Sequence, residues 1–234
     1  MIFWAGKSSD DVNTFVEHYP SQIRPAKKYN KTSVPGRNGD LIFEEGVFEN
    51  YIQPYDIYIS AEKTKLPGAA KAVAEWLYAP KGYQKLEDSY DPDVFRLAFF
   101  SGPADIENIL NIFGRATVEF DCKPQRFLVS GEEATRYFSA TTITNPTAFT
   151  ALPLITVYGS GAGALNIGGT VVNFNSIDES IELDCETENA YKGVTNLNNT
   201  ISAPSFPKLV AGANEISWSG GIESVRITPR WWTL

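Results

Sequence analysis

The chain has 234 residues, of which 43% are hydrophobic, so it is long enough for one large domain or two small domains with real cores. Its 20 Lys and Arg residues against 28 Asp and Glu give a formal net charge of −8, the wrong sign for a protein that grips nucleic acid phosphates. We therefore expect no specific nucleic acid binding. No apolar run reaches the roughly 20 residues that span a bilayer, so we expect no membrane partner. Residues 1–4 lack the basic start of a signal peptide, which predicts a protein made in the cytoplasm.

A basic segment and a turn lie near the start of the chain. Lys27, Lys28 and Lys31 make this stretch locally positive in an acidic protein, and residues 34–40 combine a proline with two glycines. The pattern predicts a loop or hairpin that presents Arg37. It fits a contact with an acidic neighbouring subunit, and it equally fits a solvated turn beside a strand edge.

Two short amphipathic helices are predicted next, within a set of strands. The first runs from Pro67 to Ala79 and ends at Pro80, and the second runs from Pro103 to Phe113. Alternating apolar residues predict strands at residues 55–59, 94–99 and 116–122. These elements indicate an α+β first domain with one or two short helices.

Helical periodicity almost disappears in the second part of the chain. We place the boundary between Ser130 and Ala140, which gives domains of residues 1–135 and 136–234. Short strands are predicted at residues 154–158, 164–167, 170–174, 180–185, 190–192, 214–218 and 224–228. The glycine-rich segment 159–163 reads as a hairpin between the first two strands. The sequence therefore predicts a mainly β chain whose second domain is an antiparallel β-sandwich.

The chain ends on Arg230, Trp231 and Trp232, followed by Thr233 and Leu234, with no polar tail. Terminal residues fray unless they are tied down, so two adjacent tryptophans indicate a docked final strand. Side chains alternate across a strand, so the two indoles are expected on opposite faces. One enters the core of the chain, and the other needs a second domain, a second subunit or a sugar.

Patterns of catalytic and metal sites are weak. His18 is the only histidine, and Cys122 and Cys185 read as reduced, buried thiols rather than as nucleophiles or zinc ligands. Segment 159–163 lacks the lysine of a phosphate-binding loop, and acidic residues 178–184 favour a turn with an exposed acidic strand face over a calcium site. Carboxylate pairs for a glycosidase are present but unspecific. We expect no enzyme activity, no catalytic residue, no cofactor and no metal.

Five motifs occur together, in order, over nearly the whole chain. They are residues 34–40, residues 120–125 (Phe-Asp-Cys-Lys-Pro-Gln), Asn145-Pro146, residues 153–161 (Pro-Leu-Ile-Thr-Val-Tyr-Gly-Ser-Gly) and residues 229–232 (Pro-Arg-Trp-Trp). In this combination the chain resembles the distal tail protein (Dit) family of siphophages, the long-tailed phages with non-contractile tails.

The resemblance implies a structural protein of the virion, located at the distal end of the tail. It implies a β-barrel first domain with a flanking helix, six copies of which form a hub ring as a homo-hexamer. A peripheral second domain would be similar to galectin-like or carbohydrate-binding β-sandwiches. The ring would join the tail-tube protein to the tail-tip protein, and receptor-binding proteins would attach to this baseplate hub.

Within that family frame, the basic segment becomes a predicted subunit interface. The residues expected there are Lys27, Lys28, Lys31, Pro35, Gly36, Arg37, Asn38 and Gly39, and the acidic residues expected to face them on a neighbouring copy are Glu44, Glu45 and Glu49. An alternative function is that of a carbohydrate-binding, lectin-like module with Trp218, Trp231 and Trp232 as an aromatic platform. Packing of these tryptophans is favoured, because no constellation of Asn, Arg, His and Trp at short spacing accompanies them.

Overall fold

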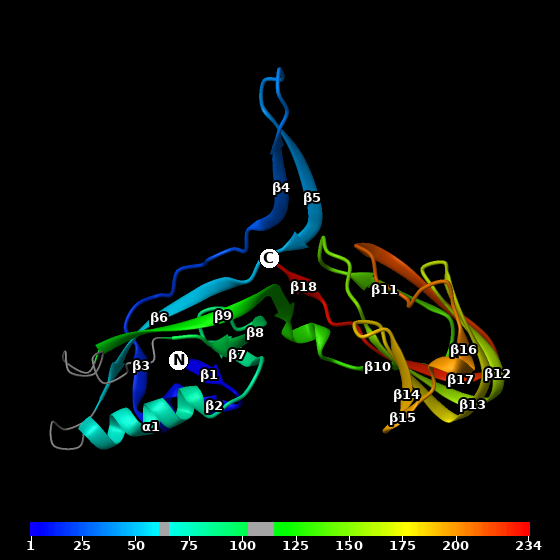
Figure 1. The fold of residues 1–234 in the computed structure, drawn as a ribbon. Coiled ribbons are helices and arrows are strands. Elements are labelled where there is room, and N and C mark those ends of the chain that lie inside the picture. Colours follow the sequence, from blue (N-terminus) through cyan, green and yellow to red (C-terminus); the bar gives the residue numbers. More distant parts are fainter. Residues whose placement is uncertain (61–65, 103–114) are drawn as a thin grey trace. The chain divides into compact units, whose positions relative to one another are not determined.

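The structure is a computed structural model that describes residues 1–60, 66–102 and 115–234 (Figure 1). These residues are mainly β, with one α-helix, and form two compact units. The first unit comprises Met1–Arg126 with Leu234, and the second comprises Phe127–Thr233. A mainly β chain with an α+β first part and an all-β second part is therefore confirmed.

The first unit is built on one antiparallel sheet whose strand order differs from the order of the strands in the chain. Its strands are β1 (Ile2–Trp4), β2 (Lys7–Ser8), β3 (Thr14–Val16), β6 (Tyr51–Ile59), β7 (Gln84–Asp88), β8 (Val94–Phe100) and β9 (Arg115–Leu128). They are arranged in the order β2-β1-β7-β8-β9-β6-β3, which leaves β2 and β3 as edges, as in a barrel that is only partly closed. A short 3-10 helix, η1 (Ser9–Val12), joins β2 to β3.

Helix α1 (Leu66–Tyr78) covers the core of this sheet, as Figure 1 shows. It agrees within one residue with the helix predicted at residues 67–79. Its buried residues Val73, Trp76 and Leu77 pack into the cluster that holds Trp4 and Phe120. The helix predicted at residues 103–113 lies outside the described residues.

Strands β4 (Lys27–Ser33) and β5 (Asp40–Phe48) form a separate two-stranded sheet, which Figure 1 shows as an isolated ribbon. The loop between them is residues 34–39, so the predicted hairpin is confirmed.

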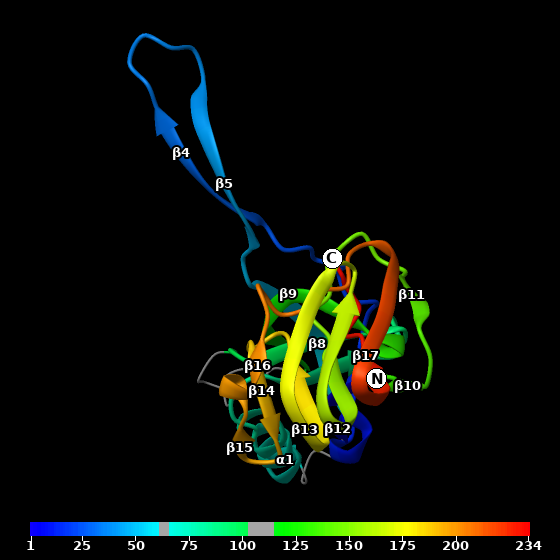
Figure 2. The same cartoon turned by 90° about the vertical axis from the view of Figure 1, so that its right-hand side faces the viewer.

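The second unit contains three long strands and several short ones. They are β10 (Thr135–Tyr137), β11 (Thr141–Asn145), β12 (Leu154–Ile167), β13 (Thr170–Asp184), β14 (Asn189–Lys192), β15 (Thr195–Asn196), β16 (Ile201–Ser202), β17 (Gly212–Thr228) and β18 (Trp232–Thr233), with 3-10 helices η2 (Val129–Gly131) and η3 (Asn198–Thr200). Figure 2 shows β12, β13 and β17 curving side by side.

Each long strand belongs to both layers of a β-sandwich. Strand β11 pairs with the first part of β17, whereas β10 pairs with its last part. Likewise β16 pairs with the first part of β13, and β14 pairs with its end. Both layers contribute to one core, which includes Val157 from one layer and Leu165 from the other. The antiparallel sandwich predicted for this region is therefore confirmed.

The sequence predicted a hairpin at the glycine-rich segment 159–163, but this segment is a bend inside strand β12. The register with β13 and β17 shifts here. A Cβ atom added to Gly159 would lie 2.0 Å from the carbonyl oxygen of Gly221, and one added to Gly221 would lie 1.8 Å from that of Ser160. Only glycines permit the two backbones to approach this closely. We call this bend, where Gly159 and Gly221 meet, the glycine crease, and it allows the sheet to fold over its core. The actual hairpin turn is Gly168-Gly169, where both residues have positive φ.

The boundary between the two units precedes the predicted one. Strand β9 continues to Leu128, whose N–H donates to the carbonyl of Trp231 at 2.8 Å, and Arg230 N–H donates to the carbonyl of Gly131 at 2.8 Å. Residues 127–135 are thus tied by backbone bonds to the end of the chain, so they belong to the second unit. The composition gave no sign of these contacts, which join residues about a hundred positions apart.

Candidate functional site

The β4–β5 hairpin contains all of the residues predicted for a subunit interface. Lys27, Lys28 and Lys31 lie on β4, and Pro35 to Gly39 lie in the connecting loop. Every residue of β4 is exposed, and so is each residue of the loop. Gly36 and Gly39 have φ values of +80° and +82°, in the left-handed region that favours glycine. Arg37 is therefore presented at the tip, as the sequence predicted.

Two lysines of the hairpin meet acidic residues of their own chain. Lys27 Nζ lies 3.6 Å from Glu44 Oε2, and Lys28 Nζ lies 3.3 Å from Glu45 Oε2. The ammonium of Lys31 lies 5.3 Å from the centre of the Tyr29 ring. Glu44 and Glu45 were expected to face a neighbouring copy. The short cross-strand distance satisfies them within one hairpin, and such exposed pairs contribute little to stability.

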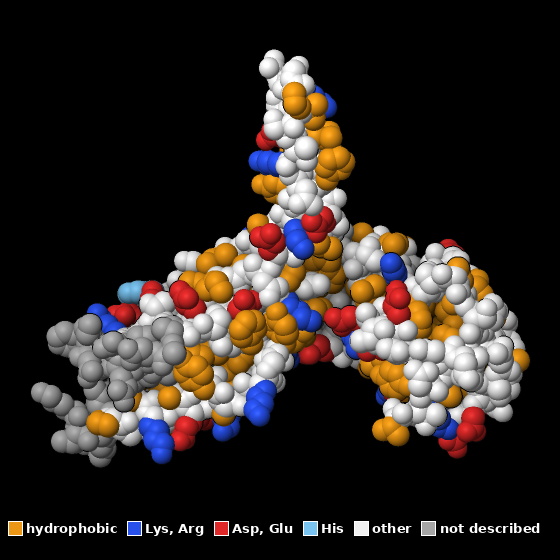
Figure 3. Space-filling model, viewed as in Figure 1, with side chains coloured by type: hydrophobic (Ala, Val, Ile, Leu, Met, Phe, Trp, Pro, Cys, Tyr) orange, Lys and Arg blue, Asp and Glu red, His pale blue; other side chains and the backbone are white. Residues whose placement is uncertain are grey.

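Several apolar side chains on the same hairpin are exposed instead of packing into the core of the first unit. Ile42, Phe43 and Val47 are 55%, 56% and 51% exposed, and Tyr29 is 47% exposed. In the register, Ile42 lies opposite Lys31 and Phe43 lies opposite Asn30, so adjacent apolar residues of β5 point to opposite faces. Figure 3 shows hydrophobic side chains along the hairpin.

A two-stranded hairpin without a covered face is marginally stable in water. Contiguous exposed apolar residues indicate a surface that a partner covers. The hairpin thus has the properties of an assembly arm, with apolar residues on both faces and with Lys27 and Lys28 already neutralised by Glu44 and Glu45.

The terminal residues dock on the second unit. Trp231 is 6% exposed and belongs to its core, whereas Trp232 stacks on Phe149 with ring centroids 4.4 Å apart and donates its indole N–H to the Thr150 carbonyl at 2.9 Å. Arg230, in a left-handed conformation with φ of +56°, places its guanidinium 2.7 Å from the carboxylate of Asp184. That guanidinium holds the pKa of Asp184 below its ordinary value despite partial burial, which alone would raise it.

These contacts show that the partners of the tryptophans lie within this chain. Trp231 and Trp232 are both engaged within the second unit, and Trp218 packs against the same core. Trp231 is buried, and Trp218 and Trp232 are half-buried in packing contacts, which favours the packing interpretation over an open stacking surface for a sugar ring.

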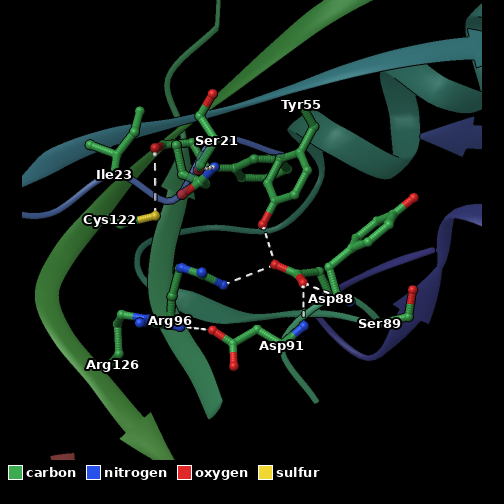
Figure 4. Close-up of polar contacts among 12 residues, drawn as sticks. Ser21, Ile23, Tyr55, Asp88, Ser89, Asp91, Arg96, Cys122 and Arg126 are labelled. Atoms are coloured by element: carbon green, nitrogen blue, oxygen red, sulfur yellow. Dashed lines mark hydrogen bonds and ion pairs between the residues drawn. The ribbon is translucent and has the colours of Figure 1, made fainter. Parts of the chain in front are cut away.

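The first unit contains a buried polar network that was not predicted from the sequence (Figure 4). The carboxylate of Asp88 accepts hydrogen bonds from Tyr55 Oη at 2.8 Å and from Arg96 Nη1 at 3.0 Å. Its other oxygen accepts the backbone N–H groups of Tyr90 and Asp91, each at 3.0 Å. The sequence contained one sign of this network, because Arg96 occupies an inward position of the apolar strand 94–99. A charged side chain at such a position can be buried only with a partner.

The network extends to Arg126 on strand β9. Arg96 Nε donates to Tyr51 Oη at 3.1 Å, and Arg126 forms an ion pair with Asp91. Burial raises the pKa of the adjacent Cys122 thiol to about 12, and it does the same for Cys185 in the second unit. Both cysteines are thus protonated at neutral pH, which makes them poor nucleophiles.

Among the described residues, no group of three His, Cys, Asp or Glu side chains lies close enough to hold a metal ion. None of the helices in the described residues is long and apolar enough to cross a membrane.

Comparisons with known proteins place this architecture. Residues 9–122 match the model of the phage tail protein RIFT-related domain. The crystal structure of SPP1 Dit (gp 19.1), a paradigm of the hub adsorption apparatus in phages that infect Gram-positive bacteria, superposes with a TM-score of 0.75 at 13% identity. The match covers 97% of this chain and 96% of that chain. No curated protein matches the sequence.

The two matches agree with the resemblance seen in the sequence motifs and confirm it. The structural match extends over both units, whereas the family match covers most of the first. Residues 9–122 are therefore similar to the phage tail RIFT-related domain, and the chain as a whole has the fold of a siphophage distal tail protein.

Proposed function

We propose that this protein is the distal tail hub of a siphophage. Six copies form a ring at the distal end of the tail, where the ring joins the tail-tube protein to the tail-tip protein and supports a receptor-binding protein. The copies are made in the host cytoplasm before they enter the virion. The role is structural and needs no enzyme activity.

The observation that carries this proposal is the β4–β5 hairpin. In a closed ring, one surface of each copy meets a different surface of the next copy. An arm with Ile42 and Phe43 exposed on opposite faces fits that need, because it can insert into a neighbour and have both faces covered. The Arg37 tip then reaches the neighbour as a charged contact.

The charge of the chain supports the same role. A ring through which a genome passes must not hold DNA, and a formal net charge of −8 per copy gives a surface that repels phosphates. Lys27 and Lys28, which would otherwise attract the phosphates, are neutralised by Glu44 and Glu45.

The test is the mass of the protein in solution by light scattering over a range of concentrations, with negative-stain images of the largest species. The measurement is repeated with the tail-tube and tail-tip proteins added. We expect rings of six copies for the unmodified chain and loss of the rings for the double variant Ile42→Ser with Phe43→Ser. Val194→Ser is the matched control, since Val194 is fully exposed in the second unit.

Arg37→Glu isolates the charged contact at the tip. We expect it to weaken ring assembly without affecting the fold, because Arg37 is exposed and lies in a loop. Normal assembly of this variant would remove Arg37 from the interface. A chain that stays monomeric alone and with both partner proteins would refute the hub role itself.

A further inference from the structure

A pair of arginines on the second unit has no carboxylate partner among the described residues. Arg136 on β10 and Arg226 on β17 lie directly opposite each other in the antiparallel register. Side chains in such a pair project to the same face with Cβ atoms about 5 Å apart, where like charges repel. Neither guanidinium forms an ion pair with any described residue, although the chain as a whole is acidic.

Both guanidinium groups are nevertheless held in place. Arg136 donates from Nε and Nη2 to the hydroxyl of Ser224, at 2.9 and 2.8 Å, and Ser224 is completely buried. The Arg136 guanidinium lies 4.0 Å from the centre of the Tyr158 ring, and the Arg226 guanidinium lies 6.0 Å from it. Arg226 also donates to Thr156 Oγ1 at 3.3 Å.

These contacts fix two repelling cations over one aromatic ring while leaving N–H donors of both without an acceptor among the described residues. Holding the two groups in advance lowers the entropic cost of binding an anion. The next carboxylate in the same cross-strand row is Glu182, beyond Thr156, and it forms no ion pair with Arg226. The site is thus complementary to an added negative charge.

Two neighbouring features indicate a protein ligand rather than a small anion. Phe138 is 73% exposed and its ring lies 5.2 Å from the Arg136 guanidinium, so an apolar surface adjoins the charges. Arginine and aromatic residues together are typical of protein interfaces. In addition, β10 is an edge strand in the described sheet, and an extended segment can pair with such an edge.

We propose that Arg136 and Arg226 form a binding site for the carboxylate side chains of an extended acidic segment of a partner protein. The segment lies along the β10 edge, its carboxylates accept from the two guanidinium groups, and its apolar side chains cover Phe138. This proposal concerns the second unit alone and does not require the ring.

The experiment uses the full chain labelled with 15N and two peptide probes, acetyl-Val-Glu-Val-Glu-Val-amide and the same peptide with Gln in place of Glu. Alternate residues of an extended peptide share a face, so both glutamates of the first probe can reach the arginines. We expect saturable shifts of the backbone amides of β10 and the end of β17 and of the Arg136 side chain with the Glu peptide only.

Variants assign the effect to the two side chains. Arg136→Gln and Arg226→Gln should each weaken binding by about tenfold, since each removes a charge-assisted pair. Arg226→Lys should also weaken it, because lysine lacks the planar fork that matches a carboxylate. Lys208→Gln removes the same charge from another exposed position of the second unit and should leave the affinity unchanged.

Three results would overturn the proposal. They are the absence of saturable shifts with the Glu peptide, equal binding of the Gln peptide, and full affinity in the variant that lacks both arginines. Inorganic phosphate that shifts the same amides at equal or lower concentration would reassign the site to small anions.

Discussion

The carboxylate of Asp88 and the guanidinium of Arg96 form a 3.0 Å ion pair with side chains that are 2% and 5% exposed. Both also make hydrogen bonds, to tyrosines on strand β6. The pair therefore connects three strands of the first unit, and it satisfies two charges that could not be buried singly.

Breaking this pair should be costly. We expect Arg96→Met to lower the free energy of unfolding by about 3–5 kcal/mol, because it leaves the Asp88 carboxylate buried without its cation. Adding Asp88→Asn to the same chain should restore part of that loss. Urea unfolding followed by tryptophan fluorescence measures both changes.

The matched control is Lys71→Met in the exposed pair Lys71–Glu75 of α1, which should change stability by less than about 0.5 kcal/mol. A loss of that small size for Arg96→Met would mean that the buried pair does not stabilise the first unit.

The glycine crease of the second unit should tolerate no side chain. In Gly221→Ala the new methyl group would meet the carbonyl oxygen of Ser160 at 1.8 Å, and neither backbone can move without breaking the register of β12 with β17. We expect the variant to lose more than about 4 kcal/mol or to fold incompletely. Circular dichroism and thermal unfolding would detect this.

Gly68→Ala in helix α1 is the comparison, since nothing lies within 4 Å of the added methyl group. It should stabilise the protein by up to about 1 kcal/mol. Unchanged stability of Gly221→Ala would show that the crease relaxes.

The two terminal tryptophans should differ in their contributions to stability. Trp231→Ala empties a site that is 6% exposed and should cost about 3–5 kcal/mol. Trp232→Ala removes a partly buried ring stacked on Phe149 and should cost clearly less. Chemical denaturation of the two variants side by side tests the order, and equal costs would contradict the assignment of Trp231 to the core.

The two thiols should be unreactive in the folded protein. Burial raises the pKa of Cys122 and Cys185 from 9.0 to about 12, so the folded state keeps protons that the unfolded chain releases. We expect no reaction with Ellman's reagent at pH 8 until denaturant is added, and then reaction of both.

The same pKa values set a pH dependence. Because the folded pKa is the higher one, the contribution of each thiol to stability is complete below about pH 9 and falls as the pH rises toward 12. Replacing Cys122 with alanine should flatten this alkaline decline. A decline that is equally steep in the variant would assign it to other groups, such as the buried Tyr55, whose pKa burial also raises.

Local patterns of the sequence determined much of this protein. The apolar stripe and the flanking prolines placed α1 within one residue, and the Pro-Gly and Asn-Gly pairs placed the loop that presents Arg37. Alternation placed β8 and β14, and parts of the longer strands β6, β9, β12, β13 and β17. These features depend on residues a few positions apart, so a single sequence contains them.

Contacts between distant residues were decided only by the tertiary structure. Whether residues 159–163 form a turn or a bend depends on the approach of Gly221, some sixty positions away, and the boundary between units depends on the bonds of Leu128 and Gly131 to the chain end. The network around Asp88 and the opposition of Arg136 and Arg226 likewise depend on strand register. Register and sheet order arise from the packing of the whole unit, which no local periodicity specifies.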